Sequence, residues 1–335
     1  MILYKKMENF MLFACLLVTV VCKPLSTDDK NKDGFHTIIK INSHRVKSST
    51  ISGNENVDLM EGDIVKTKKL LSVIDKMKNK DKETSAFDAI QSGAWPNAIV
   101  PYIISDTMTE EDVSVIKDAL YEFMEKTCIK FVERTTELSY ISFIRDVGCY
   151  SLIGKQGGKQ DISLGQGCGY KGIALHEIMH TLGFFHEQSR RDRDSYIKIN
   201  YDNIKKDMKY NFDMYRDGEA STLEEPYDKQ SIMHYDNYAF SINGSKTIES
   251  LSDSKEVLGQ RTSLSQTDVK QLNKYYNCNS TQTNLVPNQF KKPTPSPTGC
   301  TDRPVVKDFC FNAKKQGCKP TNFIKENCKK TCNFC

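Results

Sequence analysis

The sequence predicts an α+β fold, with a twisted, mostly antiparallel or mixed sheet backed by helices in one lobe and a turn-rich second lobe. Two observations predict it. Short apolar or β-branched runs and one long helical pattern lie between residues 98 and 144. Proline and polar turn residues dominate after residue 186. We therefore expect two lobes with a cleft between them, where an extended peptide could add to a sheet edge.

The elements of the first lobe follow in chain order. Residues 98–105 are apolar and β-branched and predict a strand. Residues 109–126 repeat apolar side chains at helical spacing, with Thr109 as the expected N-cap and acidic residues in the first turn. Residues 129–132 and 140–144 predict two further strands. A helix that carries a chemical motif comes after them.

That motif begins at His176 and reads His-Glu-x-x-His-x-x-Gly-x-x-His. Residues four apart lie on one face of a helix, so His176 and His180 can present two imidazole nitrogens to one metal ion. Glu177 can reach a water on that ion without binding the ion itself. Gly183 can take the left-handed conformation that ends a helix, after which His186 arrives as a third ligand. Three protein nitrogens and an open position are the arrangement of a catalytic zinc site.

Two histidines four apart on a helix are, by themselves, more often a surface or core coincidence than a metal site. The glutamate, the glycine and the third histidine reverse that balance. Five fixed positions match by chance roughly once in a few million starting points, at equal residue usage.

Two further segments narrow the motif to one family. Residues 187–194 read Glu-Gln-Ser-Arg-Arg-Asp-Arg-Asp, and residues 231–235 read Ser-Ile-Met-His-Tyr, which predicts a methionine turn beneath the histidines. With these segments the chain resembles the astacin family of zinc endopeptidases, a branch of the metzincins. The resemblance covers residues 86–278. It implies a two-lobed metzincin protease domain, one Zn²⁺, and protein or peptide substrates such as extracellular-matrix or cuticle proteins.

The resemblance also implies a role for each residue around the metal. Glu177 is the general base that takes a proton from the attacking water. Tyr235 ligates zinc at rest and swings away to stabilise the oxyanion. Met233 is an apolar floor under the ligands, and Glu187 bonds the new N-terminus through water. Arg261 matches a position that faces the residue after the cut bond, where a guanidinium favours Asp or Glu; a solvated surface arginine is the alternative.

Residues 23–85 are polar and rich in lysine, which predicts a poorly ordered or loosely folded segment. Within this segment, the run from Met60 to Asp63 resembles the motif with which astacin pro-segments place an aspartate on the zinc. The family has Phe where this chain has Met60. Because a carboxylate is a competent zinc ligand, Asp63 is the candidate fourth ligand of a zymogen. An ordinary turn is the alternative.

The start of the mature chain follows from the same resemblance. Residues 95–96 and 100–102 match the N-terminal Trp and Ile-Pro-Tyr of astacins at the same separation. Counting back by family spacing places the new N-terminus near Ala86. Cleavage after Lys80 or Lys82 is the alternative.

The first residues predict secretion. Residues 1–22 combine Lys5 and Lys6 with an apolar stretch too short to span a bilayer comfortably, which is the pattern of a signal peptide. A membrane anchor is the alternative, and Met7 could be the true start. No later run is long and apolar enough for a membrane span in the mature chain. The net charge of +4 over 335 residues suggests no nucleic-acid partner.

Loss of the signal would leave ten cysteines, an even number that is typical of a secreted chain with disulfides. Four of them fall in the protease domain, where spacing alone allows three pairings. The resemblance implies the pairs Cys128–Cys278 and Cys149–Cys168. Sequons at Asn243 and Asn279 are candidate glycosylation sites in the same extracellular compartment.

The tail predicts a linker followed by a small module. Residues 279–299 are rich in Thr, Pro and Ser, and residues 300–335 hold six cysteines, too short a chain to fold without staples. The cysteine spacing resembles the ShKT (sea-anemone toxin-like) module. Spacing alone allows fifteen pairings. The resemblance implies Cys300–Cys335, Cys310–Cys328 and Cys318–Cys332.

The tail module has eight Lys/Arg against three Asp/Glu, which suggests an acidic surface ligand; a solvated basic face is the alternative. The toxins of this family block potassium channels with a Lys-Tyr pair. Asn322 and Phe323 stand at the matching positions, which argues against channel block.

Two other interpretations are open at this point. The chain could be a binding or channel-modulating protein with an inert enzyme domain, but such a protein would be expected to lack Glu177 or a zinc histidine, and none is missing. It could instead be another metzincin, such as a matrix metalloprotease. Glu187 and Tyr235 argue against that alternative.

Overall fold

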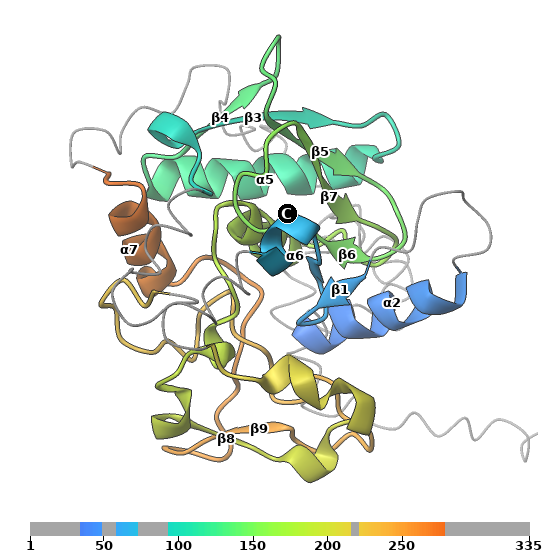
Figure 1. Cartoon of the computed structure of the whole chain (residues 1–335), viewed down its shortest axis with the longest axis vertical. Helices are drawn as coiled ribbons and strands as arrows, with labels where there is room; N and C mark the ends of the chain where they lie inside the picture. Colours follow the sequence, from blue (N-terminus) through green and yellow to red (C-terminus); the bar gives the residue numbers. More distant parts are fainter. Residues whose placement is uncertain (1–33, 49–57, 73–92, 216–220, 279–335) are drawn as a thin grey trace, which may run out of the picture. The chain divides into compact units, whose positions relative to one another are not determined.

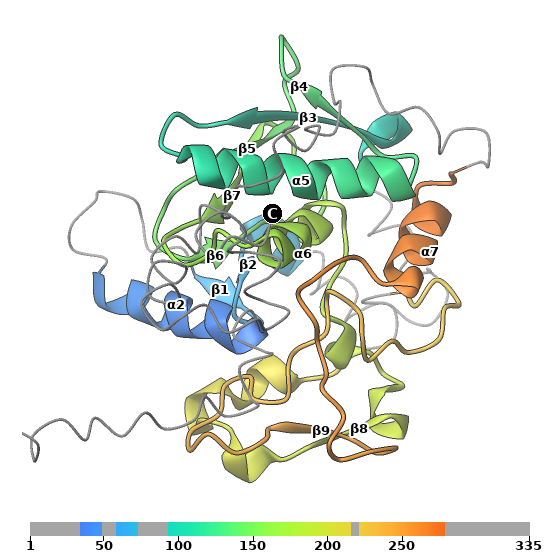
Figure 2. The ribbon, with the colours of Figure 1, turned by 180° about the vertical axis from the view of Figure 1, so that it is seen from behind.

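The structure is a computed structural model that describes residues 34–48, 58–72, 93–215 and 221–278 (Figures 1 and 2). All of them belong to the unit of chain that runs from Asp33 onward. The expected signal peptide, linker and ShKT module, with Ala86, Asn279 and the six tail cysteines, lie outside the described residues. No helix in the described ranges has both the length and the apolar character needed to cross a membrane.

The main sheet has five strands in the order β4-β3-β5-β7-β6. Their bounds are β3 Ile99–Ile104, β4 Lys130–Glu133, β5 Tyr140–Ile144, β6 Cys149–Tyr150 and β7 Lys159–Leu164. The pairs β3–β4, β3–β5 and β5–β7 are parallel, and only β6–β7 is antiparallel. The sheet is therefore mixed, which is one of the two expected arrangements, and it is not mostly antiparallel. The chain crosses from β3 to its neighbour β4 through a helix, a connection that makes the two strands parallel.

That crossover helix is α5, Glu110–Lys126, which runs between strands β3–β4 and helix α6, Lys171–Thr181 (Figures 1 and 2). Thr109 is its N-cap as expected, and Asp112 completes a reciprocal capping box. Its apolar side chains Ile116, Leu120 and Phe123 are completely buried in the main core. Burial of this stripe fixes the face that α5 turns to the sheet and to α6.

The chain after α6 has few regular elements, as the turn-rich composition predicts. Strands β8 (Ile197–Ile199) and β9 (Ile248–Ser250) form a short antiparallel pair on the far side of α6 from the sheet (Figures 1 and 2). Short 3₁₀ helices fill much of the rest, at Pro96–Ala98 before the sheet and at Glu187–Ser189, Arg193–Ser195, Tyr201–Asn203 and Lys206–Phe212 after it. Helix α7, Gln266–Tyr275, closes the domain.

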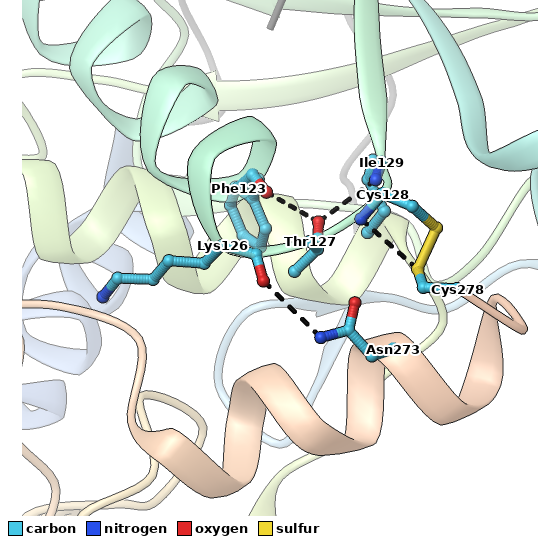
Figure 3. The surroundings of a disulfide bond; sticks show 7 residues. All are labelled: Phe123, Lys126, Thr127, Cys128, Ile129, Asn273 and Cys278. Carbon is cyan, nitrogen blue, oxygen red and sulfur yellow. Dashed lines mark hydrogen bonds between the residues drawn. A yellow bond between two sulfur atoms is a disulfide. The ribbon is translucent and has the colours of Figure 1, made fainter. Parts of the chain in front are cut away.

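Both disulfides expected in this domain are present: Cys128–Cys278 and Cys149–Cys168. Figure 3 shows Cys128 just after α5 joined to Cys278 just after α7, with Asn273 of α7 also donating to the Lys126 carbonyl. The bond therefore ties the last helix to the helix that backs the sheet.

The segment before the protease domain is better ordered than expected in its described parts. It forms helix α2 (Phe35–Ser48) and the short pair β1 (Leu59–Met60) and β2 (Ile64–Val65). Phe35 and Ile38 are completely buried in the main core. These elements use the apolar surface of the protease domain as their core, so the prediction of a loosely folded segment, which rested on composition alone, is wrong for them.

Candidate metal centre

Helix α6 carries His176, Glu177 and His180, and all three are completely buried. Gly183 has φ +106°, the left-handed conformation expected of it, and the helix ends just before it. The chain then returns so that His186, also buried, faces the other two histidines. The structure therefore brings the three predicted ligands together.

Each of the three histidines is oriented by its Nδ1 atom. His176 Nδ1 lies 2.8 Å from the Ile232 carbonyl, and His180 Nδ1 lies 2.8 Å from the Phe184 carbonyl. Since a carbonyl can only accept, both Nδ1 atoms carry the proton and both Nε2 atoms present a lone pair. His186 Nδ1 lies 2.7 Å from a carboxylate oxygen of Glu61, which fixes the same tautomer when the ring is neutral.

Asp63 lies at the point where the three Nε2 atoms converge, and it is completely buried there. Its oxygens are 2.9 Å from His176 Nε2, 3.5 Å from His180 Nε2 and 3.4 Å from His186 Nε2. The Nε2 atoms of His176 and His186 are 3.2 Å apart. A tetrahedral zinc ion with bonds of about 2.0–2.1 Å separates its ligand atoms by about 3.3–3.4 Å. The four side chains therefore fit one zinc ion.

The electrostatics of the cluster favour a cation. Burial by itself would raise the pKa of Asp63, but the neighbouring histidines hold it well below its ordinary value. Burial would lower the pKa of His186, but the carboxylates of Asp63 and Glu61 raise it to about 9. Burial and the charge of Arg261 hold the pKa of His176 well below its ordinary value, so that ring is neutral and can offer Nε2 to a metal. The negative charges of Asp63 and Glu61 are what favour a metal cation here. Asp63 Oδ1 and His180 Nε2 are buried and make no hydrogen bond with any described residue, as expected of atoms that would bind a metal ion.

Glu177 is buried beside this cluster. Burial raises the pKa of its carboxyl group well above the ordinary value, and the negative charge of Asp63 raises it further. The Ser151 hydroxyl and the Arg261 guanidinium act in the opposite direction. A carboxylate with a raised affinity for protons, next to a metal site, can accept a proton from a water there.

The methionine turn contacts the first of these histidines, since the Ile232 carbonyl lies 2.8 Å from His176 Nδ1. Met233 is buried in the main core, and its N–H donates to the Ser231 hydroxyl. The Tyr235 ring stacks on Phe35 of α2 with centroids 4.0 Å apart. Its hydroxyl donates to the Glu61 carbonyl at 2.7 Å. Residues 35 and 61, far from Tyr235 in the sequence, therefore fix its ring and its hydroxyl in the same structure in which Asp63 faces the histidines.

Glu187 accepts from the Arg190 guanidinium at 3.0 Å and from the Asp228 N–H at 2.9 Å. Burial raises its pKa to about 7, against the charge of Arg190. A cavity of about 50 Å³ opens beside it, and Met233 and Gln271 are among its lining residues. This volume has room for a few water molecules.

Arg261 is buried, not a solvated surface arginine. Its guanidinium carbon lies 5.7 Å from the centre of the Phe35 ring, which is cation–π distance. One nitrogen donates to the carbonyls of His234 and Gln260, while Nε and the other terminal nitrogen make no hydrogen bond with a described residue. The Asn243 sequon lies on the surface, where a glycan could be attached.

Some residues of the site were not predicted. Glu61 contacts His186 and Tyr235. It belongs to the same run of residues 60–63 as the predicted ligand Asp63, and that position was a signal from which its role could have been predicted. Phe35 covers Tyr235, and His36 contacts Asp236 through both its N–H and its ring, with no local signal for either. Their roles follow only from contacts between segments far apart in the chain.

Comparison with known proteins agrees with this geometry. A model of the peptidase family Astacin matches residues 88–277. The zinc metalloproteinase nas-13 of Caenorhabditis elegans is 44% identical over 218 residues, which are 64% of this chain and 48% of that protein. High choriolytic enzyme 1 of Oryzias latipes is 38% identical over 242 residues, which are 70% of this chain and 84% of that one.

A solved structure of high choriolytic enzyme 1, described as a hatching enzyme zinc-protease, has a similar fold, with a TM-score of 0.54 and 41% sequence identity. The match covers 60% of this chain and 100% of the other. The chain spans about half the length of the nematode relatives it matches.

Proposed function

The chain belongs to the astacin family of zinc metalloendopeptidases, and we propose that it is a secreted endopeptidase made as an inactive precursor. The observation that carries the proposal is the convergence of three histidine Nε2 atoms on the carboxylate of Asp63. The histidines are the ligands of one Zn²⁺, and Asp63, which comes from the segment before the protease domain, is the fourth ligand of the precursor.

Zinc, when bound, lowers the pKa of a water molecule and polarises the carbonyl of the peptide bond. Glu177 takes the proton of the attacking water and passes it to the departing amine. The Tyr235 hydroxyl donates to the carbonyl oxygen, which becomes the oxyanion when water attacks the carbonyl carbon. Met233 supports the ligands from below. The substrates are proteins or peptides, such as those of an extracellular matrix or cuticle.

Two contacts support latency. The carboxylate of Asp63 occupies the position that a water needs, and the Tyr235 hydroxyl is engaged by the Glu61 carbonyl. Cutting the chain near Ala86 would release both. The freed N-terminus would then enter the cavity beside Glu187 and bond to that carboxylate through water, as in other members of the family.

Arg261 selects an acidic residue after the cut bond. In the precursor its guanidinium is covered by Phe35, and two of its nitrogens make no hydrogen bond with a described residue. Removal of Phe35 would leave these donors for a substrate carboxylate. Cleavage of a peptide library by the Arg261→Ala enzyme would test this, and an unchanged preference for Asp or Glu would exclude it.

Several further features, most of them outside the described residues, complete the proposal. Residues 1–22 direct secretion, and residues 279–299 are a linker. Residues 300–335 are an ShKT module with three disulfides, whose basic charge binds an acidic surface. Asn243 and Asn279 carry glycans.

The test of the activity is hydrolysis of a denatured protein by the activated chain. We expect cleavage that stops when a chelator removes the metal and returns with added Zn²⁺. The Glu177→Ala enzyme should bind zinc normally and lose activity by about 10²–10⁴-fold. Equal cleavage by this variant would refute the mechanism.

A further inference from the structure

We propose that Glu61 is a positioning residue of the latent state. Its carboxylate holds His186, the third histidine of the metal site, through Nδ1, the ring nitrogen that faces away from the metal. This inference rests on the proposed zymogen function and extends it from the metal itself to the ligands around it. Asp63 acts on the metal directly, whereas Glu61 acts through His186.

The contacts of Glu61 are concentrated on groups of the metal site. One carboxylate oxygen, Oε2, lies 2.7 Å from His186 Nδ1 and accepts a hydrogen bond from the Tyr215 hydroxyl at 2.8 Å. The Glu61 carbonyl accepts from the Tyr235 hydroxyl at 2.7 Å. The Tyr215 hydroxyl in turn accepts from the His186 backbone N–H. His186 is therefore held at its ring and at its backbone by one carboxylate and its tyrosine partner.

The backbone of Glu61 is strained, with φ +52° in the left-handed region that a glutamate rarely adopts. Such a conformation is unfavourable for a residue with a side chain and persists only where the surroundings determine it. The neighbouring Gly62 takes φ +91° at no such cost, so a glycine at position 61 would make the same turn more easily. The retained side chain is buried, and its contacts with His186 and Tyr215 offset the strain.

The charge of Glu61 also suits the site. A buried Zn²⁺ bound by three neutral histidines and one carboxylate keeps a net positive charge, which is costly in a buried place. A second carboxylate, hydrogen-bonded to the outer nitrogen of a ligating histidine, offsets that charge and raises the basicity of the ligand. Asp63 and Glu61 together match the double charge of the ion. Both leave with the pro-segment, so cleavage weakens the hold on zinc and frees Tyr235 at the same time.

The experiment compares the precursor with its Glu61→Gln variant. Glutamine has the same length and similar backbone preferences, so the change removes the charge and leaves the turn. We expect the zinc affinity of the uncleaved variant, measured by competition with a chromogenic chelator, to fall about tenfold. Asp58→Asn is the matched control, because Asp58 is an exposed acid on the same hairpin that pairs with Lys66 and contacts no ligand. It should leave zinc affinity unchanged.

Activation supplies an internal control. Cleavage removes residue 61, so the mature enzymes from wild type and from Glu61→Gln have the same sequence and must bind zinc equally. A deficit that survives cleavage would mean misfolding and would overturn the proposal. So would a Glu61→Gln precursor that holds zinc as tightly as wild type.

An Asp63→Ala precursor separates this inference from the proposed function. This variant should bind zinc less tightly, and it should hydrolyse a peptide substrate before its pro-segment has been cut away. If Asp63→Ala remains fully silent and retains zinc like wild type, the zymogen switch fails. If Asp63→Ala responds as expected while Glu61→Gln matches wild type, only the role of Glu61 fails.

Discussion

Asn42 of α2 pairs with the backbone of Cys149 as a neighbouring strand would. Its Nδ2 donates to the Cys149 carbonyl at 2.7 Å, and the Cys149 N–H donates to its Oδ1 at 2.8 Å. Nδ2 also donates to the Gly62 carbonyl at 2.8 Å. Cys149 begins β6, the edge strand of the sheet. One side chain therefore ties together the helix, the turn that carries Asp63 and the β6 edge of the protease sheet.

Replacing Asn42 with alanine should loosen the pro-segment. The change removes the Asn42 partner from the buried N–H and carbonyl of Cys149, at about 1–3 kcal/mol for each group, and from the half-buried Gly62 carbonyl. We expect faster cutting of residues 34–72 by a broad-specificity protease at low concentration, followed by mass spectrometry. Ser43→Ala is the control, since the Ser43 hydroxyl only bonds the Lys40 carbonyl on the exposed face. Equal rates for the two variants would contradict the role of Asn42.

Much of the catalytic lobe could be predicted because its signals are local. The strand expected at 140–144 coincides with β5, and the Thr109 cap precedes α5 as its spacing implied. The ligand motif needs only a helix and a glycine stop to bring His176, His180 and His186 together. The parallel pairing of β3 with β4 was not predicted, although the strand–helix–strand order contained it.

The pro-segment could be predicted at Asp63 and hardly elsewhere. Its helix depends on burying Phe35 against Tyr235 and Phe240, two hundred residues away in the sequence. The polar, lysine-rich composition of this segment does not predict a core, because most of the apolar residues of that core belong to the protease domain. Contacts of this kind need the folded surface, so Phe35, Asn42 and Glu61 followed only from the structure.

Removing the hydroxyl of Tyr235 should slow the chemical step. The Tyr235→Phe enzyme keeps the ring packing against Phe212 and Phe240 but loses the donor to the oxyanion. We expect kcat to fall about 10²–10³-fold with KM little changed, measured on a fluorogenic peptide after activation. Tyr276→Phe is the control, because it also removes a buried hydroxyl, bonded to the Leu182 carbonyl. A similar small loss in both enzymes would show that Tyr235 only packs.

The two disulfides should differ in their effect on stability. Cys128–Cys278 closes a loop of 150 residues, and Cys149–Cys168 closes one of 19. In the chain-entropy picture their removal lowers the free energy of unfolding by about 5 and about 3 kcal/mol. Denaturant unfolding of the two double Cys→Ser variants measures this. A larger loss for the shorter loop would mean that local packing around Cys149, rather than loop closure, dominates.

Stability should also depend on pH through Glu122 of α5. Its carboxylate accepts from Lys126 at 2.7 Å and from the Leu264 N–H at 2.8 Å, and it pairs with Lys171 of α6. Burial by itself would raise the pKa of Glu122, but these partners hold it below the ordinary value of 4.5. A lowered folded-state pKa means that the stabilisation is fully present above 4.5 and is lost as the pH falls through the folded value.

We expect Glu122→Gln to lower the free energy of unfolding at pH 7, and the difference from wild type to shrink steadily on acidification below pH 4.5. Urea unfolding at several pH values measures it. Glu111→Gln is the control, because it removes an exposed carboxylate of the same helix that makes none of these contacts. A constant difference across the pH range would mean that the two lysines contribute through packing alone.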